Sequence, residues 1–164
     1  MKRTIQAINQ LKRAGLIEDY AIGGGIATIF YVEPFVTYDL DVFIIPSQKT
    51  KKGNLILLSP IFDYFKGQGF RWQGEHIIIE GIPVQFIPAD ELEEEAVIKA
   101  KTIKYESVKT KVLTPEYLIP ILLRAGRKKD KEKVEKLLEQ TSIDMKLLKD
   151  VLKRYHLKGK IDLS

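Results

Sequence analysis

The chain has 164 residues, of which 45% are hydrophobic and 30% charged, the balance of a globular protein rather than a disordered one. A chain of this length is most simply one domain spanning residues 1–164. It contains no cysteine, which excludes disulfides, zinc–thiolate sites and a catalytic thiol. No apolar run approaches the roughly 20 residues of a membrane span, and the N-terminus does not resemble a signal peptide, so we expect a cytoplasmic protein with no membrane association.

The formal net charge of +5 is unevenly distributed along the chain. Residues 90–95 form an acidic cluster, whereas residues 99–136 are strongly basic. This pattern is typical of a face that binds a phosphate-rich partner such as RNA, and equally of a solvated helix surface. The sequence leaves both interpretations open. The basic stretch includes Arg124, Arg127, Lys128 and Lys129.

The first third of the chain predicts a helix, a strand, a short helix and a buried strand. Ile5, Ile8 and Leu11 recur at helical spacing. The short strand runs directly into a glycine run, and the second helix must stop before Pro34. The last segment is apolar at nearly every position except its two aspartates, which is typical of a central strand. These four segments are residues 3–15, 20–22, 26–32 and 39–45.

The middle and the end of the chain differ in character. The middle predicts a helix over 56–66, a hairpin turning at Gly81, a helix over 90–100 and a pair of short strands within 101–113. From Thr114, a helix cap followed by proline, the pattern is helical to about Leu157, with breaks near Gly126 and residues 141–142. We therefore expect an α+β or α/β core over 1–113, with a mixed sheet flanked by helices, and a helical C-terminal extension over 114–164. The two strands of the hairpin are residues 75–80 and 82–87.

Two motifs that lie close together in the first third could carry chemistry. Asp39 and Asp41 project from the same side of one strand, because side chains alternate along a strand. Two such carboxylates repel each other unless a divalent cation compensates them, and Mg²⁺ (or Mn²⁺) prefers oxygen ligands. The preceding glycines, residues 23–25, leave room for a triphosphate to approach the backbone. The combination predicts a nucleotide site.

The same residues also permit a simpler interpretation and partly match two rival motifs. Glycines between a strand and a helix are often only a tight turn. A Walker A loop requires a lysine after the glycines, and none is present. A dinucleotide fingerprint fits Gly23 and Gly25, but its third glycine would fall on Thr28, and the chain continues into a hairpin rather than repeated βαβ units.

Four stretches together resemble a known family. They are Gly-Gly-Ile-Ala at 24–27, Thr-x-Asp-Leu-Asp at 37–41, Leu-Thr-Pro-Glu-Tyr-Leu at 113–118 and Arg-Lys-Lys-Asp at 127–130. The sequence resembles the DNA polymerase β-like nucleotidyltransferase superfamily, nearest to its minimal nucleotidyltransferase and abortive-infection nucleotidyltransferase toxin branches. The resemblance covers most of the chain and is most specific at the glycine–aspartate motif.

The resemblance implies a nucleotidyltransferase fold with a mixed sheet. It also implies a Mg²⁺-dependent transfer of a nucleoside monophosphate from a nucleoside triphosphate to a hydroxyl. Asp39 and Asp41 would be the metal ligands and catalytic residues, with Asp130 as a further catalytic candidate. The implied nucleotide-binding residues are Gly24, Gly25, Thr37 and Lys129.

The sequence departs from the family pattern at three places. A third carboxylate is expected on the neighbouring strand, where this chain has Gln85, and Glu80 or Asp90 could substitute for it. An amide oxygen can ligate a metal but brings no charge, so Gln85 is either a weak site member or an ordinary polar residue. Phe35 stands where a basic residue is common. Leu122 or Leu123 stands where the toxin branch has a lysine.

Two classes of function follow, and a third is weaker. The chain could be an enzyme with an RNA, tRNA or protein acceptor, belonging to a toxin–antitoxin pair with a cognate antitoxin or a helical nuclease partner. The alternative is a catalytically reduced protein on the same fold, which binds nucleotide, RNA or a partner protein without turnover. The third is a purely electrostatic nucleic-acid-binding module, whose binding would be indifferent to Asp39 and Asp41.

Overall fold

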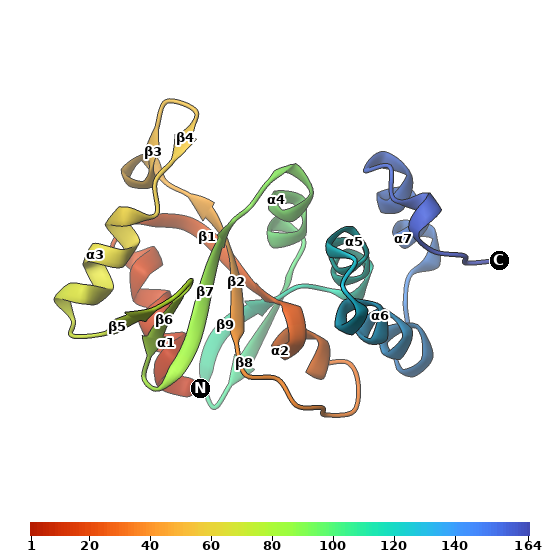
Figure 1. Cartoon of the computed structure of the whole chain (residues 1–164), viewed down its shortest axis with the longest axis horizontal. Coiled ribbons are helices and arrows are strands. Elements are labelled where there is room, and N and C mark those ends of the chain that lie inside the picture. The colour runs from red at the N-terminus through yellow and green to blue at the C-terminus, as the bar shows by residue number, and fades with distance from the viewer.

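The computed structural model describes residues 1–164 and shows a mixed seven-stranded sheet with helices around it (Figure 1). The order across the sheet is β5-β6-β7-β2-β1-β9-β8, and a separate two-stranded ribbon joins β3 to β4. The expected α+β class is therefore confirmed. The strands are β1 (Ile17–Gly23), β2 (Leu40–Pro46), β3 (Lys51–Lys52), β4 (Leu55–Ile56), β5 (Arg71–Gln73), β6 (His76–Ile79), β7 (Ile82–Pro88), β8 (Lys101–Tyr105) and β9 (Val108–Val112).

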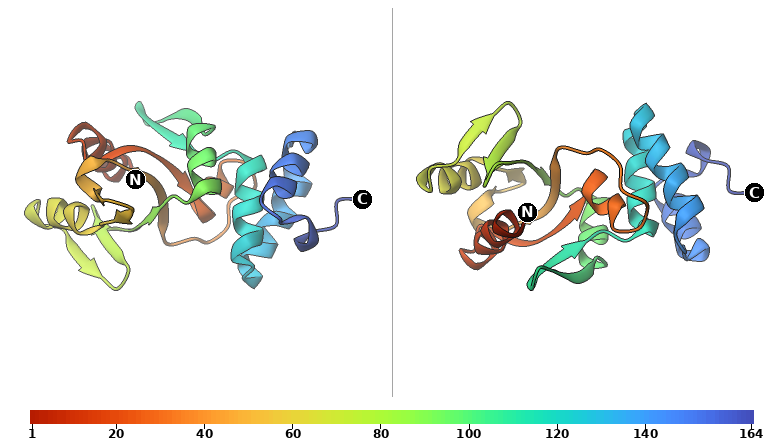
Figure 2. Two further views of the ribbon diagram at one scale, coloured as in Figure 1. Left: turned by 90° about the horizontal axis from the view of Figure 1, so that it is seen from above. Right: turned by 90° about the horizontal axis from the view of Figure 1, so that it is seen from below.

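Seven α-helices and two short 3₁₀ helices complete the chain. None of the helices is long and apolar enough to cross a membrane. In both views of Figure 2 the last three α-helices lie at one end of the molecule, beside the C-terminus. The helices are α1 (Lys2–Arg13), α2 (Gly24–Ile29), α3 (Ser59–Gly67), α4 (Glu91–Ile98), α5 (Pro115–Ala125), α6 (Lys128–Gln140) and α7 (Met145–Arg154), with η1 (Gln48–Thr50) and η2 (Lys158–Lys160).

Strand β2 lies at the centre of the sheet because nearly all its side chains are apolar and buried. It pairs antiparallel with β1, which places Gly23 opposite Asp41. On its other side it pairs parallel with β7, which places Gln85 opposite Asp41. Register alone therefore brings the glycine turn, the second aspartate and Gln85 into one row.

The hairpin predicted around Gly81 is present as β6 and β7, with Ile79 opposite Ile82. Glu80 and Gly81 form its two-residue turn, and both have positive φ values of 52° and 79°, as the tight primed turns of hairpins require. The paired strands expected within 101–113 are also confirmed, as β8 and β9.

Several predicted boundaries differ from the structure. The helix predicted over 56–66 begins only at Ser59, because Leu55 and Ile56 pair with Lys51 and Lys52 in the ribbon. The hairpin is extended by a third strand, β5, which the sequence pattern did not distinguish. The short strand predicted over 20–22 reaches back to Ile17, because its first residues pair with the end of β2.

The helical extension packs on the sheet through a shared core. One cluster of 34 buried residues includes strand residues and residues of α5, α6 and α7 alike. Glu95 of α4 reinforces this junction, because it accepts hydrogen bonds from Arg154 of α7 at 2.7 Å and from Tyr117 of α5 at 2.7 Å. The predicted helical breaks fall near Gly126, which ends α5 in the left-handed conformation, and between α6 and α7.

Candidate functional site

The glycine turn and the second aspartate are in direct contact. Gly24 follows β1, has a φ of +59° and begins α2. A Cβ atom at this position would collide with the carboxylate of Asp41. Glycine is thus required twice here, once for the left-handed backbone and once for the space that the carboxylate occupies.

The next glycine approaches Thr37 just as closely. A Cβ on Gly25 would lie 2.5 Å from Thr37 Oγ1 and 3.7 Å from Lys133 Cε. Thr37 belongs to the loop of residues 33–39 that leads into β2, and it is half-buried. Gly24, Gly25 and Thr37, the residues predicted to bind nucleotide at the turn, are therefore side by side.

The two aspartates differ in their surroundings. Asp39 lies just before β2 and is exposed, whereas Asp41 is half-buried. Burial raises the pKa of Asp41 above its ordinary value, and the charge of Asp39 raises it further, while Arg127, Lys133 and His76 act in the opposite direction. Asp41 forms no hydrogen bond or ion pair of its own, so its negative charge is available to a bound cation.

His76 and Glu75 reach this site from the next hairpin, and sequence patterns did not single out either as a site residue. His76 Nε2 lies 3.5 Å from Asp39 Oδ2. The side chain of Gln85 donates a hydrogen bond from Nε2 to Glu75 Oε2 at 3.4 Å. Gln85 is thus close to a carboxylate, but the carboxylate comes from the β5–β6 turn rather than from β7.

The two acidic residues considered as substitutes for the third carboxylate have other partners. Glu80 lies in the β6–β7 turn and is 3.8 Å from Arg3. Asp90 caps α4 by accepting a hydrogen bond from the Glu93 amide, and its carboxylate is 2.7 Å from Arg124. Neither lies beside Asp41.

Asp130 is fully buried and does not line the cleft. Its Oδ2 accepts a hydrogen bond from Arg127 Nε at 2.7 Å, its Oδ1 accepts one from Nη2 at 3.1 Å, and Lys133 Nζ lies 3.5 Å away. Burial alone would raise the pKa of Asp130, but these cations hold it below the ordinary value. Asp130 therefore fixes two cations that themselves face the cleft.

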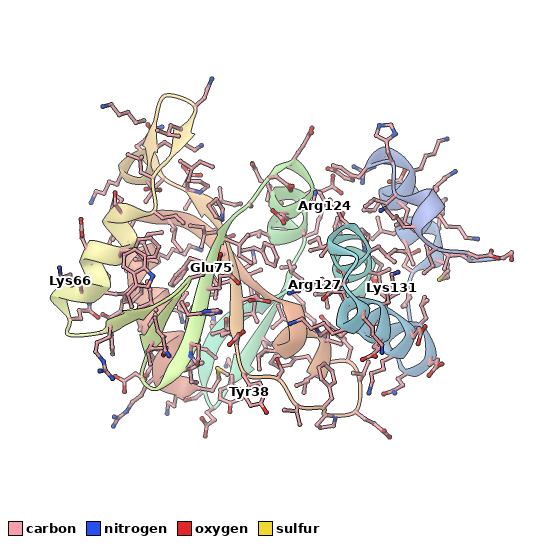
Figure 3. All side chains as sticks on the ribbon, in the orientation of Figure 1. Tyr38, Lys66, Glu75, Arg124, Arg127 and Lys131 are labelled. Carbon is pink, nitrogen blue, oxygen red and sulfur yellow. The ribbon has the colours of Figure 1, made fainter.

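A cleft of about 440 Å³ joins these groups. One wall is the glycine turn with Thr37, Asp39, Asp41 and Gln85, and the opposite wall comes from α5 and α6, between which Arg127 lies (Figure 3). Such a size suits a small-molecule site. The cations lining it are Arg124, Arg127, Lys129 and Lys133, and Leu122 is among the apolar residues of the α5 wall.

The donor set at Asp39 and Asp41 fits a hard divalent ion with few protein ligands. No group of three or more metal-binding side chains forms anywhere in the chain. Mg²⁺ is commonly held by one or two carboxylates and takes its remaining ligands from water and substrate phosphates. Asp41, which has no ion pair, and Asp39, whose neighbouring charged group is the imidazole of His76, match that requirement.

The chain matches no protein-family model and no curated protein. Among solved structures, it is similar to an antigenic nucleotidyltransferase-like protein from Paracoccidioides brasiliensis, at 18% identity and a TM-score of 0.56, over 96% of this chain and 89% of that one. It is also similar to the antibiotic-resistance factor ANT(2'')-Ia, at 14% identity and a TM-score of 0.55, over 95% and 91% of the two chains. These likenesses show that the chain has a nucleotidyltransferase-like fold.

Proposed function

We propose that this protein transfers a nucleoside monophosphate from a nucleoside triphosphate to a hydroxyl acceptor, with Mg²⁺ or Mn²⁺ as cofactor. The observation that carries the proposal is the contact between Gly24 and the unpaired Asp41 at the edge of a cation-lined cleft. The nucleotidyltransferase-like fold supports it.

Each wall of the cleft has a distinct task in this proposal. Gly24, Gly25 and Thr37 let the triphosphate approach the backbone, and Lys129 and Lys133 neutralise its charge. Arg127 joins them, oriented by the buried carboxylate of Asp130. Asp39 and Asp41 would hold the divalent ion, which supplies charge neutralisation and a lower pKa for the acceptor hydroxyl.

The reaction is an in-line displacement. The acceptor oxygen bonds to the α-phosphorus, the bond from that phosphorus to the bridging oxygen breaks, pyrophosphate leaves and the hydroxyl proton passes to water. Preorganised cations at the positions where charge develops lower the barrier. Gln85 lies in register with Asp41 and contributes an amide that can orient the acceptor or a bound water.

The proposed acceptor is RNA, such as tRNA, or a protein hydroxyl. The basic side chains of α6 next to the cleft support an acidic acceptor. We further propose a cytoplasmic role within a toxin–antitoxin system, in which a cognate antitoxin or a helical nuclease would be the partner. The resemblance of the sequence motifs to the toxin branch supports this part.

The position of Gln85 favours a second candidate, a protein that binds nucleotide, RNA or a partner without turnover. An amide replaces the carboxylate expected opposite Asp41, so the site has one negative charge fewer for a second metal. Gln85→Asp separates the two candidates. We expect it to raise transfer in an enzyme limited by metal affinity, and to tighten metal binding without transfer in a binding protein.

The deciding experiment incubates the protein with each α-labelled nucleoside triphosphate, Mg²⁺ or Mn²⁺, and total RNA. We expect label in RNA or protein with the wild type and with the control Asp162→Asn, and none with Asp39→Ala/Asp41→Ala. Metal-dependent nucleotide binding without labelling would favour the second candidate. Labelling that survives the double substitution would refute the assignment of this site.

A further inference from the structure

A second hollow, at the β5 edge of the sheet, lies outside the cleft. It has a volume of about 510 Å³ and lies between α3 and the β5–β6 hairpin. Trp72 of β5 pairs with Ile77 of β6, so both project from the same face of the sheet. His76, the neighbour of Ile77, contacts Asp39. Because neighbouring residues face opposite sides, the hollow lies on the face opposite the aspartates.

The wall of this hollow is an exposed aromatic surface. Trp72 is 55% exposed, and its ring centroid lies 3.6 Å from that of Phe62. Phe70 lines the hollow beside them. A large aromatic ring that stays half in water on an edge strand is a platform on which a planar ligand can stack.

The rim of the hollow is positive. Lys66 and Arg71 line it and are exposed, and neither forms an ion pair. Asp63 lies one turn before Lys66 on α3 and also lines the hollow, but the two side chains form no ion pair. In Figure 3, Lys66 lies at the outer end of α3 and points away from the sheet. Unpaired cations around stacked rings match a base that is linked to phosphates.

The hairpin that builds the hollow also reaches the candidate active site. Its tip carries Glu75 and His76, which contact Gln85 and Asp39. Strand β5 is three strands from β2 in the sheet, which corresponds to about 14 Å at the usual spacing between strands. Because the hollow and the aspartates lie on opposite faces, a single strand that reaches both must pass around the free edge of β5.

From this arrangement we infer that the acceptor is single-stranded RNA, with its terminal hydroxyl beside Asp39 and an upstream base stacked on Trp72. The inference rests on the proposed function for the role of acceptor. The inference that RNA binds at the hollow does not depend on that function, because it follows from the geometry of the hollow. Lys66 and Arg71 neutralise the phosphates on either side of the stacked base.

The fluorescence of Trp72 tests the inference directly, because it is the sole tryptophan of the chain. The protein is the full-length Asp39→Asn/Asp41→Asn variant without nucleoside triphosphate, so no transfer can occur. We expect saturable quenching by single-stranded oligouridylate or oligoadenylate. Duplex RNA and equal concentrations of UMP or AMP should leave the signal unchanged.

Variants measure the contribution of the hollow, with binding followed by the anisotropy of a labelled oligonucleotide. We expect Trp72→Ala and the pair Lys66→Ala/Arg71→Ala each to weaken binding about tenfold, and Trp72→Phe to retain most of the affinity. Two matched controls should bind like the parent: Leu55→Ala, which removes an apolar side chain that is 61% exposed, and Lys158→Ala, which removes an exposed cation.

Three outcomes would overturn the inference. Unchanged Trp72 fluorescence on saturation with RNA would show that no base stacks there. Equal quenching by mononucleotides would assign the hollow to a free nucleotide, and a signal that depends on protein concentration alone would assign it to a second copy of the chain.

A comparison with the transfer assay separates this inference from the proposed function. Transfer to RNA that is indifferent to Trp72→Ala would overturn the inference and leave the activity intact. If RNA quenches the fluorescence of Trp72 but the wild type transfers no nucleotide, the proposed activity is wrong. The RNA site itself would then stand, and the acceptor role would be refuted.

Discussion

Gly24 combines two demands in one position. Its left-handed backbone is unfavourable for any residue with a side chain, and the carboxylate of Asp41 occupies the space where a Cβ would lie. Gly53 has a similar φ of +63° but no atom within 4 Å of its missing Cβ. A comparison of substitutions at Gly24 and Gly53 therefore separates two costs: the strain of the left-handed backbone, which both share, and the collision with Asp41, which only Gly24 has.

We expect Gly24→Ala to lower the free energy of unfolding by about 3 kcal/mol and to abolish nucleotide binding, because it displaces Asp41 as well as straining the backbone. The matched control Gly53→Ala should cost about 1 kcal/mol and leave nucleotide binding unchanged. Urea unfolding and a nucleotide titration measure the two effects. Equal losses for the two variants would mean that the contact with Asp41 contributes nothing.

The contributions of Asp41 and Asp19 to the free energy of unfolding should depend on pH with opposite signs. Burial, and then the charge of Asp39, raise the pKa of Asp41 in the folded state. A raised pKa gives stability that is present below the unfolded-state pKa and lost as pH rises through the folded-state pKa. The ionised form therefore destabilises the fold at pH 7, and Asp41→Asn should increase the free energy of unfolding there by about 1 kcal/mol. The gain should vanish in acid.

Asp19→Asn is the matched control. Burial alone would raise the pKa of Asp19, but hydrogen bonds from Lys111, the Tyr20 amide and Lys12 lower it below its ordinary value. Its stabilisation is present above the unfolded-state pKa and disappears as pH falls through the folded-state pKa. Asp19→Asn should thus destabilise the protein at pH 7, and unfolding curves from pH 3 to 7 measure both variants. Destabilisation by Asp41→Asn at pH 7 would contradict the assigned pKa direction.

The first turn of α6 is organised around a buried charge. Asp130 is fully buried and holds Arg127 and Lys133, whose own side chains line the cleft. The carboxylate also accepts a hydrogen bond from the Arg127 amide at 3.3 Å, which caps the helix. One residue therefore anchors α6 and aims two cations at the site.

We expect Asp130→Ala to lower the free energy of unfolding by about 2 kcal/mol, because it leaves the helix cap and the cations without their acceptor. The affinity for a nucleoside triphosphate should fall about tenfold, since Arg127 loses its orientation. Glu135→Ala, an exposed position on the same helix, is the control and should change neither quantity. If Asp130→Ala combined with Arg127→Ala loses the sum of the two single effects, the two residues are not coupled and the account of α6 is wrong.

The whole chain folds around one core. The cluster of 34 buried residues extends from the sheet into α5, α6 and α7, and Glu95 joins α4 to α5 and α7. Hydrogen bonding to Arg154 is the main cause that lowers the pKa of Glu95 to about 2, so this junction persists through the range in which ordinary carboxylates titrate. We therefore expect the helical extension to fold together with the sheet as one unit.

We expect a single cooperative unfolding transition. Trp72 fluorescence reports the outer edge of the sheet and far-ultraviolet circular dichroism reports mainly the helices, so their midpoints should coincide. Leu118→Ala in α5 should cost about 3 kcal/mol and shift both midpoints together, because Leu118 is 1% exposed. The control Ile98→Ala, at a side chain that is 60% exposed, should shift neither. Loss of the helical signal before the tryptophan signal would show two independent units.

The sequence by itself determined the fold class, most helices, the central strand β2 and the hairpin at Gly81. These follow from local patterns, such as alternation along a strand and a glycine in a two-residue turn, which depend only on neighbouring residues. The glycine–aspartate motif belongs to this group, because Gly24 and Asp41 lie on adjacent elements. The assignment of a metal and nucleotide to that motif stays a prediction.

Only the tertiary structure decided what surrounds the aspartates. Arg127 and Lys133 enter the cleft because α6 packs beside α2, about a hundred residues later in the chain. His76 and Glu75 arrive through the pairing of β6 with β7, and the hollow at Trp72 forms only when α3 covers that hairpin. Such contacts depend on register and packing between distant segments, which no local pattern of residues encodes.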